Sequence, residues 1–250
     1  MLLLLTASVF LGSALLQSIA GFGFSLFAVS ALLMLDYPLP EAVVLSTFGS
    51  TIQRCIGVAN LHRSADWRAL SPLILIGIFV LPIGIWLLQS LSLQEKSFIG
   101  QVFGILLLTI LTIRTFLKLK PKDKVHWSWG YLAAICSGIL NGLANIGGPP
   151  LVLWIHAHRW TTEKKRVSTL LFTLPCVPFQ FIFLYQVFGD LVPKTLFLGL
   201  FLIPTTVVGT FIGLAMGKKV SEKLLRLLSY SILMVLGIFL ILKPFIGQLL

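Results

Sequence analysis

The chain has 250 residues, of which 57% are hydrophobic and 11% are charged. A soluble domain of this size needs far more polar surface, so the composition excludes a soluble globular protein. The net charge of +11 does not indicate nucleic-acid binding, because the lysines and arginines lie in short connections between apolar runs of about 20 residues. We expect an all-α polytopic protein of the cell (inner) membrane, in contact with the lipid bilayer.

The first half of the chain contains five apolar segments. The second segment is too short to cross a bilayer comfortably, and it follows a break at Gly21-Phe-Gly23, where glycine permits backbone conformations that a helix does not use. An acidic turn at Asp36 separates this short segment from the third. The expected helices of this half cover residues 2–20, 24–35, 41–61, 70–88 and 98–117.

The second half repeats this order. When Ser13 is set on Ser137, the first break coincides with a second one, Asn145-Ile-Gly-Gly-Pro-Pro150. Proline there removes backbone donors and disfavours the helical conformation of the preceding residue. The expected helices cover residues 129–143, a short segment that ends near 155, 163–187, 191–216 and 221–242. We divide the chain into a first transmembrane repeat (1–120), a basic cytoplasmic linker (121–128) and a second transmembrane repeat (129–250).

The connections of the two halves carry opposite charge patterns. In the first half the basic connection follows the third segment, at Arg63 and Arg68, whereas in the second half it precedes the corresponding segment, at Lys164 and Lys165. If basic connections face the cytoplasm, the corresponding segments cross the membrane in opposite directions. This pattern favours an inverted repeat, with four long apolar helices and one short half-helix in each half. The alternative is a parallel arrangement of the two halves, which places Lys164 and Lys165 outside the cell.

The two breaks form the candidate binding site. Helices interrupted at membrane depth line protein or a wet cavity, and paired interruptions in two repeats point to the substrate site of a transporter. The short helices after the breaks begin with free backbone donors and the positive end of the helix dipole, which bind anions. Neutral side chains near the breaks either assist anion binding or form hydrogen bonds with the backbone groups that the breaks leave unpaired: Gln17, Ser25, Asn141 and Asn145.

Arg54 is the most unusual polar residue of the third segment. It lies eight residues before His62, or about 12 Å along the helix, where a guanidinium by default faces an interior cavity or a partner. Snorkelling of the side chain to the interface is the alternative. Further polar residues in this segment and in its counterpart either contact the substrate or form hydrogen bonds between helices: Ser46, Thr47, Ser50, Ser168 and Thr169.

With these features the chain resembles the TauE/SafE sulfite-exporter-like family of membrane permeases. The resemblance rests on two homologous halves that each open with a glycine-interrupted segment, Gly21-Phe-Gly23 and Asn145-Ile-Gly-Gly148. In each half a Ser-Thr pair follows in the next helix, and the resemblance covers nearly the whole chain. It implies permeation of small anions such as sulfite, sulfonates or related organic acids.

We therefore expect a secondary transporter that moves a small anion by alternating access. An anion channel is the alternative, and an intramembrane enzyme is disfavoured because no histidine lies mid-segment to act as the base for a serine nucleophile. We expect no cofactor, metal site or catalytic residue; a coupling ion, proton or sodium, and a homo-oligomer stay open. The candidate substrate-binding residues are Gln17, Gly21, Gly23, Ser25, Ser46, Thr47, Ser50, Arg54, Asn141, Asn145, Gly147, Gly148, Ser168 and Thr169.

Overall fold

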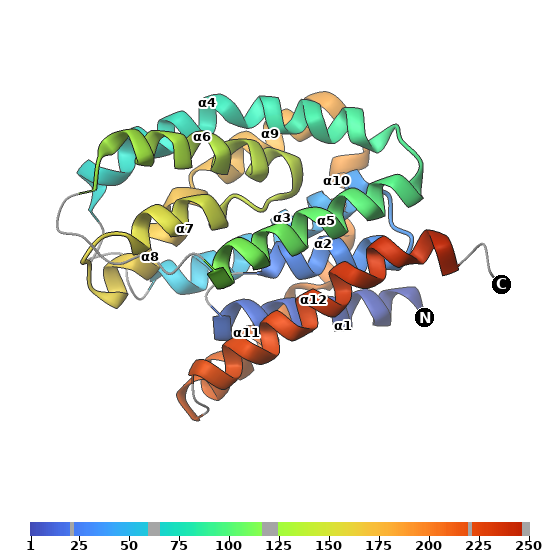
Figure 1. Cartoon of the computed structure of the whole chain (residues 1–250). Helices are drawn as coiled ribbons and strands as arrows, with labels where there is room; N and C mark the ends of the chain where they lie inside the picture. Colours follow the sequence, from blue (N-terminus) through green and yellow to red (C-terminus); the bar gives the residue numbers. More distant parts are fainter. Residues whose placement is uncertain (21–22, 60–65, 117–124, 220–221, 247–250) are drawn as a thin grey trace.

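The structure, a computed structural model, describes residues 1–20, 23–59, 66–116, 125–219 and 222–246. The elements in these ranges are α-helices, which confirms the expected all-α fold (Figure 1). The first half forms α1 (Leu2–Ala20), α2 (Phe24–Met34), α3 (Leu39–Ala59), α4 (Trp67–Ser92) and α5 (Lys96–Phe116). The second half forms α6 (Trp127–Ala144), α7 (Gly148–His156), α8 (Thr162–Thr173), α9 (Cys176–Phe188), α10 (Leu191–Phe201), α11 (Ile203–Lys219) and α12 (Glu222–Ile246).

Two ion pairs mark opposite ends of the helix bundle. At one end, which we call the Asp36 end, Lys243 of α12 pairs with Asp36 at 2.9 Å, and Lys96 at the start of α5 donates to the Asp36 carbonyl. At the other, the Asp66 end, Lys164 of α8 pairs with Asp66 at 2.9 Å. The length of α4 separates these ends, since α4 starts after Asp66 and finishes just before α5. Consequently α3 begins at the Asp36 end, whereas α8 begins at the Asp66 end (Figure 1).

Close helix pairs depend on glycine. Helix α4 lies along α6, α1 along α11 and α5 along α12. In the first pair a Cβ atom built on Gly138 would lie 2.7 Å from the carbonyl oxygen of Gly77, and in the second a Cβ on Gly209 would lie 2.7 Å from that of Leu11. Small residues that allow backbones to approach are typical of helix association in membranes. These contacts fix the long helices that carry the two breaks.

Breaks interrupt more helices than the sequence predicted. The helix expected over 163–187 is divided into α8 and α9 at Pro175, and the helix expected over 191–216 is divided into α10 and α11, which are bent by 55°. Pro175 and Pro204 lack the N–H that would continue the backbone hydrogen bonds, which explains both interruptions. As a result α8 is a short helix with a break directly after it.

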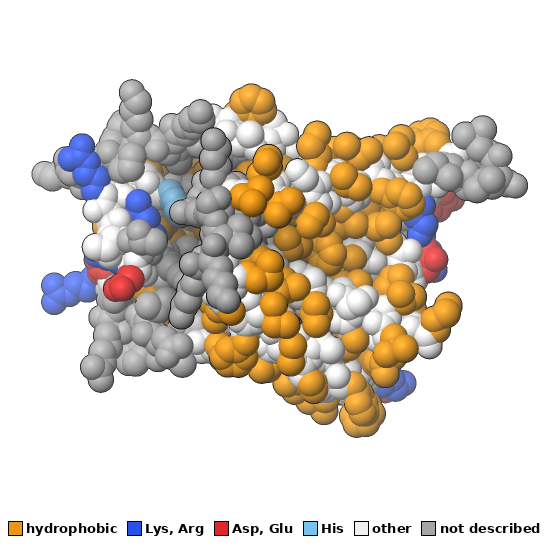
Figure 2. All heavy atoms as spheres, turned by 90° about the horizontal axis from the view of Figure 1, so that it is seen from below, with side chains coloured by type: hydrophobic (Ala, Val, Ile, Leu, Met, Phe, Trp, Pro, Cys, Tyr) orange, Lys and Arg blue, Asp and Glu red, His pale blue; other side chains and the backbone are white. Residues whose placement is uncertain are grey.

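A broad apolar band covers the middle of the molecule, with charged side chains toward both ends (Figure 2). Among the described residues, five helices are long and apolar enough to cross a membrane when α8 and α9 count as one span, Glu163–Phe188, and six when the bent pair α10 and α11 counts as another. Helices α3 and α6 are not among them, so fewer than the eight expected long helices pass this test. The reason in α3 is its content of polar residues, Ser46 to Arg54, which lowers its hydropathy. The chain is a multi-span membrane protein.

The apolar interior is divided into two clusters. The larger cluster contains residues of the first five helices together with α9, α10 and α12, whereas the smaller one joins the start of α4 to α6, α7 and α8. In the smaller cluster Phe172 of α8 packs on Gly77 of α4, where a Cβ atom would lie 2.9 Å from its ring. Helix α8 therefore packs with the smaller cluster.

Candidate functional site

A narrow cavity lies between the two breaks. Its volume is about 50 Å³, which is enough for a few water molecules or one small ion. The α1–α2 break and α3 contribute one wall, and the α6–α7 break and α8 contribute the other. The lining residues are Gln17, Gly23, Phe24, Ser25, Leu26, Arg54, Asn145, Ile146, Gly148, Pro149, Thr169, Leu170 and Thr173.

Arg54 of α3 supplies the positive charge of this cavity. Its side chain is buried rather than extended to the interface, with 6% exposure. Nη2 donates to Oδ1 of Asn145 at 3.1 Å, while Nη1 is buried and has no hydrogen-bond partner. No Asp or Glu is present among the described residues that line the cavity. The cavity thus contains a guanidinium with an unused donor and no lining carboxylate to neutralise it.

Asn145 joins three elements at the second break. It ends α6 in the left-handed region, with φ 55°, a conformation that asparagine adopts more readily than most residues. Its Nδ2 donates to the hydroxyls of Ser25 in α2 and Ser50 in α3, each at 2.8 Å, while its Oδ1 accepts from Arg54. One buried amide therefore links the two halves of the chain and orients the guanidinium.

One backbone donor in the first turn of each short helix already has a side-chain partner. The N–H of Phe24 donates to Oε1 of Gln17 at 3.2 Å, and the N–H of Leu151 donates to the hydroxyl of Ser137 at 3.1 Å. Pro149 and Pro150 have no N–H to offer. The prediction that these helix starts present free donors to an anion is wrong for Phe24 and Leu151, because polar side chains satisfy the broken backbone there.

The structure brings about half of the predicted residues to the cavity. Those that line it are Gln17, Gly23, Ser25, Arg54, Asn145, Gly148 and Thr169, and Ser50 contacts it through Asn145. Gly23 has φ 108°, which explains why glycine occupies the start of α2. Gly148 has open space around it, since a Cβ atom there would meet nothing within 4 Å.

The other predicted residues lie away from the cavity lining. Ser46 and Thr47 donate to the carbonyl of Val43 in their own helix, two turns before Arg54. Gly147 packs tightly, because a Cβ atom there would lie 2.7 Å from the carbonyl oxygen of Ser137. Asn141 and Ser168 are fully buried, each with side-chain polar atoms that have no hydrogen-bond partner, and Gly21 lies outside the described residues.

Two glutamines that are not among the candidate substrate-binding residues hold the helices that end at the breaks. Gln53 of α3 donates to the carbonyl of Ala14 at 2.8 Å and to the hydroxyl of Ser18 at 2.7 Å, both in α1. Gln180 of α9 donates to the carbonyl of Asn141 in α6 at 2.8 Å. Each is a polar residue within an apolar run, and this was the signal available in the sequence. The apolar lining residues, such as Leu170, gave no comparable signal.

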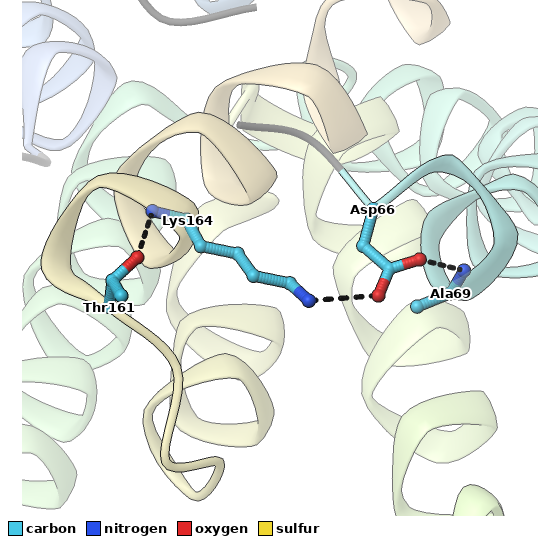
Figure 3. Close-up of polar contacts among 4 residues, drawn as sticks. All are labelled: Asp66, Ala69, Thr161 and Lys164. Atoms are coloured by element: carbon cyan, nitrogen blue, oxygen red, sulfur yellow. Dashed lines mark hydrogen bonds and ion pairs between the residues drawn. The ribbon is translucent and has the colours of Figure 1, made fainter. Parts of the chain in front are cut away.

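An ion pair outside the cavity ties α8 to α4 (Figure 3). Asp66 caps α4 by accepting from the N–H of Ala69, and it also accepts from Nζ of Lys164 at 2.9 Å. The hydrogen bond from Lys164 lowers the pKa of Asp66 below its ordinary value, so the carboxylate remains charged at neutral pH. Thr161 caps α8 by accepting from the N–H of Lys164, whose ammonium lies 4.5 Å from the centre of the Trp160 ring.

A multi-span helical protein with a buried cationic cavity between two interrupted helices has the architecture of a membrane transporter. The model of the sulfite exporter TauE/SafE family matches residues 5–240, and the chain belongs to this family. Its members are membrane transporters of sulfur-related anions, which places the chain among transporters and confirms the family expected from the sequence. The comparisons with curated proteins and with solved structures find no match.

Proposed function

We propose that the protein is a secondary transporter that carries a small oxyanion, such as sulfite, an organosulfonate or a related organic acid, by alternating access. The observation that supports this most directly concerns Arg54, which lines the cavity and whose Nη1 is buried without a hydrogen-bond partner. A charged side chain at membrane depth is costly and by default faces a partner or a pathway. An anion in the cavity supplies that partner.

The chemistry of the lining favours a small oxyanion. Arg54 offers a charged donor from the wall that α3 forms, while Thr169 and Thr173 line the opposite wall with hydroxyls that donate to carbonyls of their own helix. A hydrogen bond to a charged group contributes roughly 1.5 to 3 kcal/mol, so the charged donor favours binding without preventing release. The volume of about 50 Å³ favours the smallest candidates, of which sulfite is one. A bulkier sulfonate requires the cavity to widen.

The arrangement of the two halves supports alternating access. We infer that the halves are inverted repeats, because α3 and its counterpart α8 begin at opposite ends of the bundle. Paired interrupted helices that enclose a site between such repeats are typical of secondary transporters. A proton or sodium is the candidate coupling ion, and the basic connections favour an Asp66 end that faces the cytoplasm.

Binding and counterflow measurements test this function. Sulfite should raise the thermal midpoint of the purified protein and bind with a saturable isotherm, while a neutral solute of similar size should do neither. In proteoliposomes, unlabelled sulfite inside should accelerate the entry of labelled sulfite, because a carrier exchanges its substrate. Flux that rises linearly with concentration and shows no counterflow would instead identify a channel, and absence of any sulfite effect would remove the proposed substrate.

A further inference from the structure

Leu170 differs from the other apolar residues of α8. Val167, Leu171 and Phe172 are buried in the smaller apolar cluster with α4 and α7. Leu170 is only half-buried, belongs to neither of the two clusters, and lines the cavity instead. Core packing therefore does not account for a leucine at this position. Another role must explain why an apolar side chain lines the cavity.

The side chain of Leu170 rests on Gly57 of α3. A Cβ atom built on Gly57 would lie 2.9 Å from Cδ1 of Leu170, and no other neighbouring atom lies within 4 Å of that position. The leucine thus fills the space that the missing side chain of Gly57 leaves on α3. This contact joins a helix of the first half to one of the second.

The contact between Leu170 and Gly57 lies between the cavity and the Asp66 end. Helix α3 runs away from the Asp36 end, and Gly57 follows Arg54 by three residues, or about 4.5 Å along the helix axis. On the opposite side of Arg54, one turn earlier, Ser50 and Asn145 close the site by hydrogen bonds. The cavity therefore has a polar wall toward the Asp36 end and an apolar contact toward the Asp66 end.

Helix α8 is held on α4 at its start by the ion pair between Lys164 and Asp66. Pro175 interrupts the hydrogen bonding between α8 and α9, which together form one span, Glu163–Phe188. Phe172 of α8 packs on Gly77 of α4. Helix α8 thus contacts α4 through an ion pair and an aromatic ring, whereas Leu170 supplies an apolar contact with α3.

We propose that Leu170, seated on Gly57, is the gate that separates the anion cavity from the Asp66 end. The gate opens when α8, moving with α4 and α7, separates from α3. An apolar constriction of this kind excludes hydrated ions while it is closed. This proposal rests on the proposed function, because it identifies the side from which the anion enters the proposed binding site.

A thiol-labelling experiment tests the gate. Thr173→Cys places a thiol in the cavity, in a background where Cys55, Cys136 and Cys176 are replaced by alanine. A charged, membrane-impermeant thiosulfonate added from the Asp66 end should label this cysteine at least tenfold faster when Leu170→Ala is also present. Leu200→Ala is the matched control, because Leu200 is 50% exposed on α10, and it should leave the labelling rate unchanged.

Gly57→Ala provides a second route to the same result. Alanine favours the helix over glycine, so α3 should fold, while the new methyl group displaces Leu170 and should also accelerate labelling. Labelling at the wild-type rate in folded Leu170→Ala and Gly57→Ala proteins would overturn the gate, as would equal acceleration from the Asp36 end. Labelling requires no transported anion, so a failure of sulfite to bind would remove the proposed function and leave this result interpretable.

Discussion

Nη2 of Arg54 in α3 donates to Oδ1 of Asn145 at the end of α6, with 3.1 Å between the two atoms. The partner of this buried guanidinium is a neutral amide, so its charge is oriented but not neutralised. Nη1 remains without a hydrogen-bond partner beside a cavity of about 50 Å³. We therefore expect replacement of Arg54 to affect anion binding more than replacement of the neutral residues around it.

The first prediction concerns the charge of Arg54. Arg54→Gln should weaken sulfite binding by more than tenfold, because it removes the charged donor while a side chain of similar shape still fills the site. Isothermal titration of the purified proteins with sulfite measures the two dissociation constants. Arg68→Gln is the matched control, since Arg68 is exposed at the start of α4, and it should bind as the wild type does. Wild-type affinity in folded Arg54→Gln would mean that the arginine has only a structural role.

The second prediction separates the side chain of Asn145 from its backbone. Asn145→Gly keeps the left-handed backbone and removes the amide that orients Arg54, so the sulfite dissociation constant should rise about ten- to a hundredfold. Asn145→Ala should show the same loss and, in addition, lower stability by about 1 to 2 kcal/mol, because alanine resists φ 55°. Equal affinity of Asn145→Gly and the wild type would argue against the amide as a part of the site. Thermal midpoints in detergent report the stability difference.

The third prediction uses two adjacent glycines as a matched pair. Gly147→Ala should reduce the yield of folded protein, because its Cβ would lie 2.7 Å from the carbonyl oxygen of Ser137 and 2.8 Å from Cβ of Asn141. Gly148→Ala should fold normally, because its Cβ would meet nothing within 4 Å, but it should weaken sulfite binding by narrowing the cavity. Size-exclusion profiles of both variants measure the yield of folded protein, and titrations with sulfite measure the affinity. The reverse pattern would show that Gly148, not Gly147, is required for packing.

The fourth prediction concerns the direction of the two halves. Cysteines placed at Ser128 and Lys165 should be labelled by an impermeant reagent from the cytoplasm, and a cysteine at Lys96 should be labelled from the other side. The reason is that positively charged connections remain on the cytoplasmic side and that the starts of α6 and α8 lie opposite the start of α5. Labelling of Lys165→Cys and Lys96→Cys from the same side would contradict the inverted arrangement.

Much of the fold was predictable from local sequence signals. Apolar runs predicted the boundaries of α1, α2 and α5 to within a few residues, because a helix in lipid must satisfy its own backbone over the whole apolar span. The break at Gly147 and Gly148 was predictable from glycine and proline chemistry. The divisions at Pro175 and before Pro204 were missed, although proline marks both, because a proline within an apolar run is compatible with a kinked helix as well as with a break.

The sequence by itself determined that this is a helical membrane protein with a deep arginine and two interrupted helices. Those features follow from composition and from the backbone chemistry of glycine and proline, which act locally. Only the tertiary structure decided which donors remain available to a ligand. Gln17 accepts from the N–H of Phe24 and Ser137 from the N–H of Leu151, while Asn145 leaves Nη1 of Arg54 unpaired. These pairings depend on contacts between helices that no local pattern specifies. Because a polar group in a membrane bonds the nearest partner in space, its role depends on packing rather than on its neighbours in the chain.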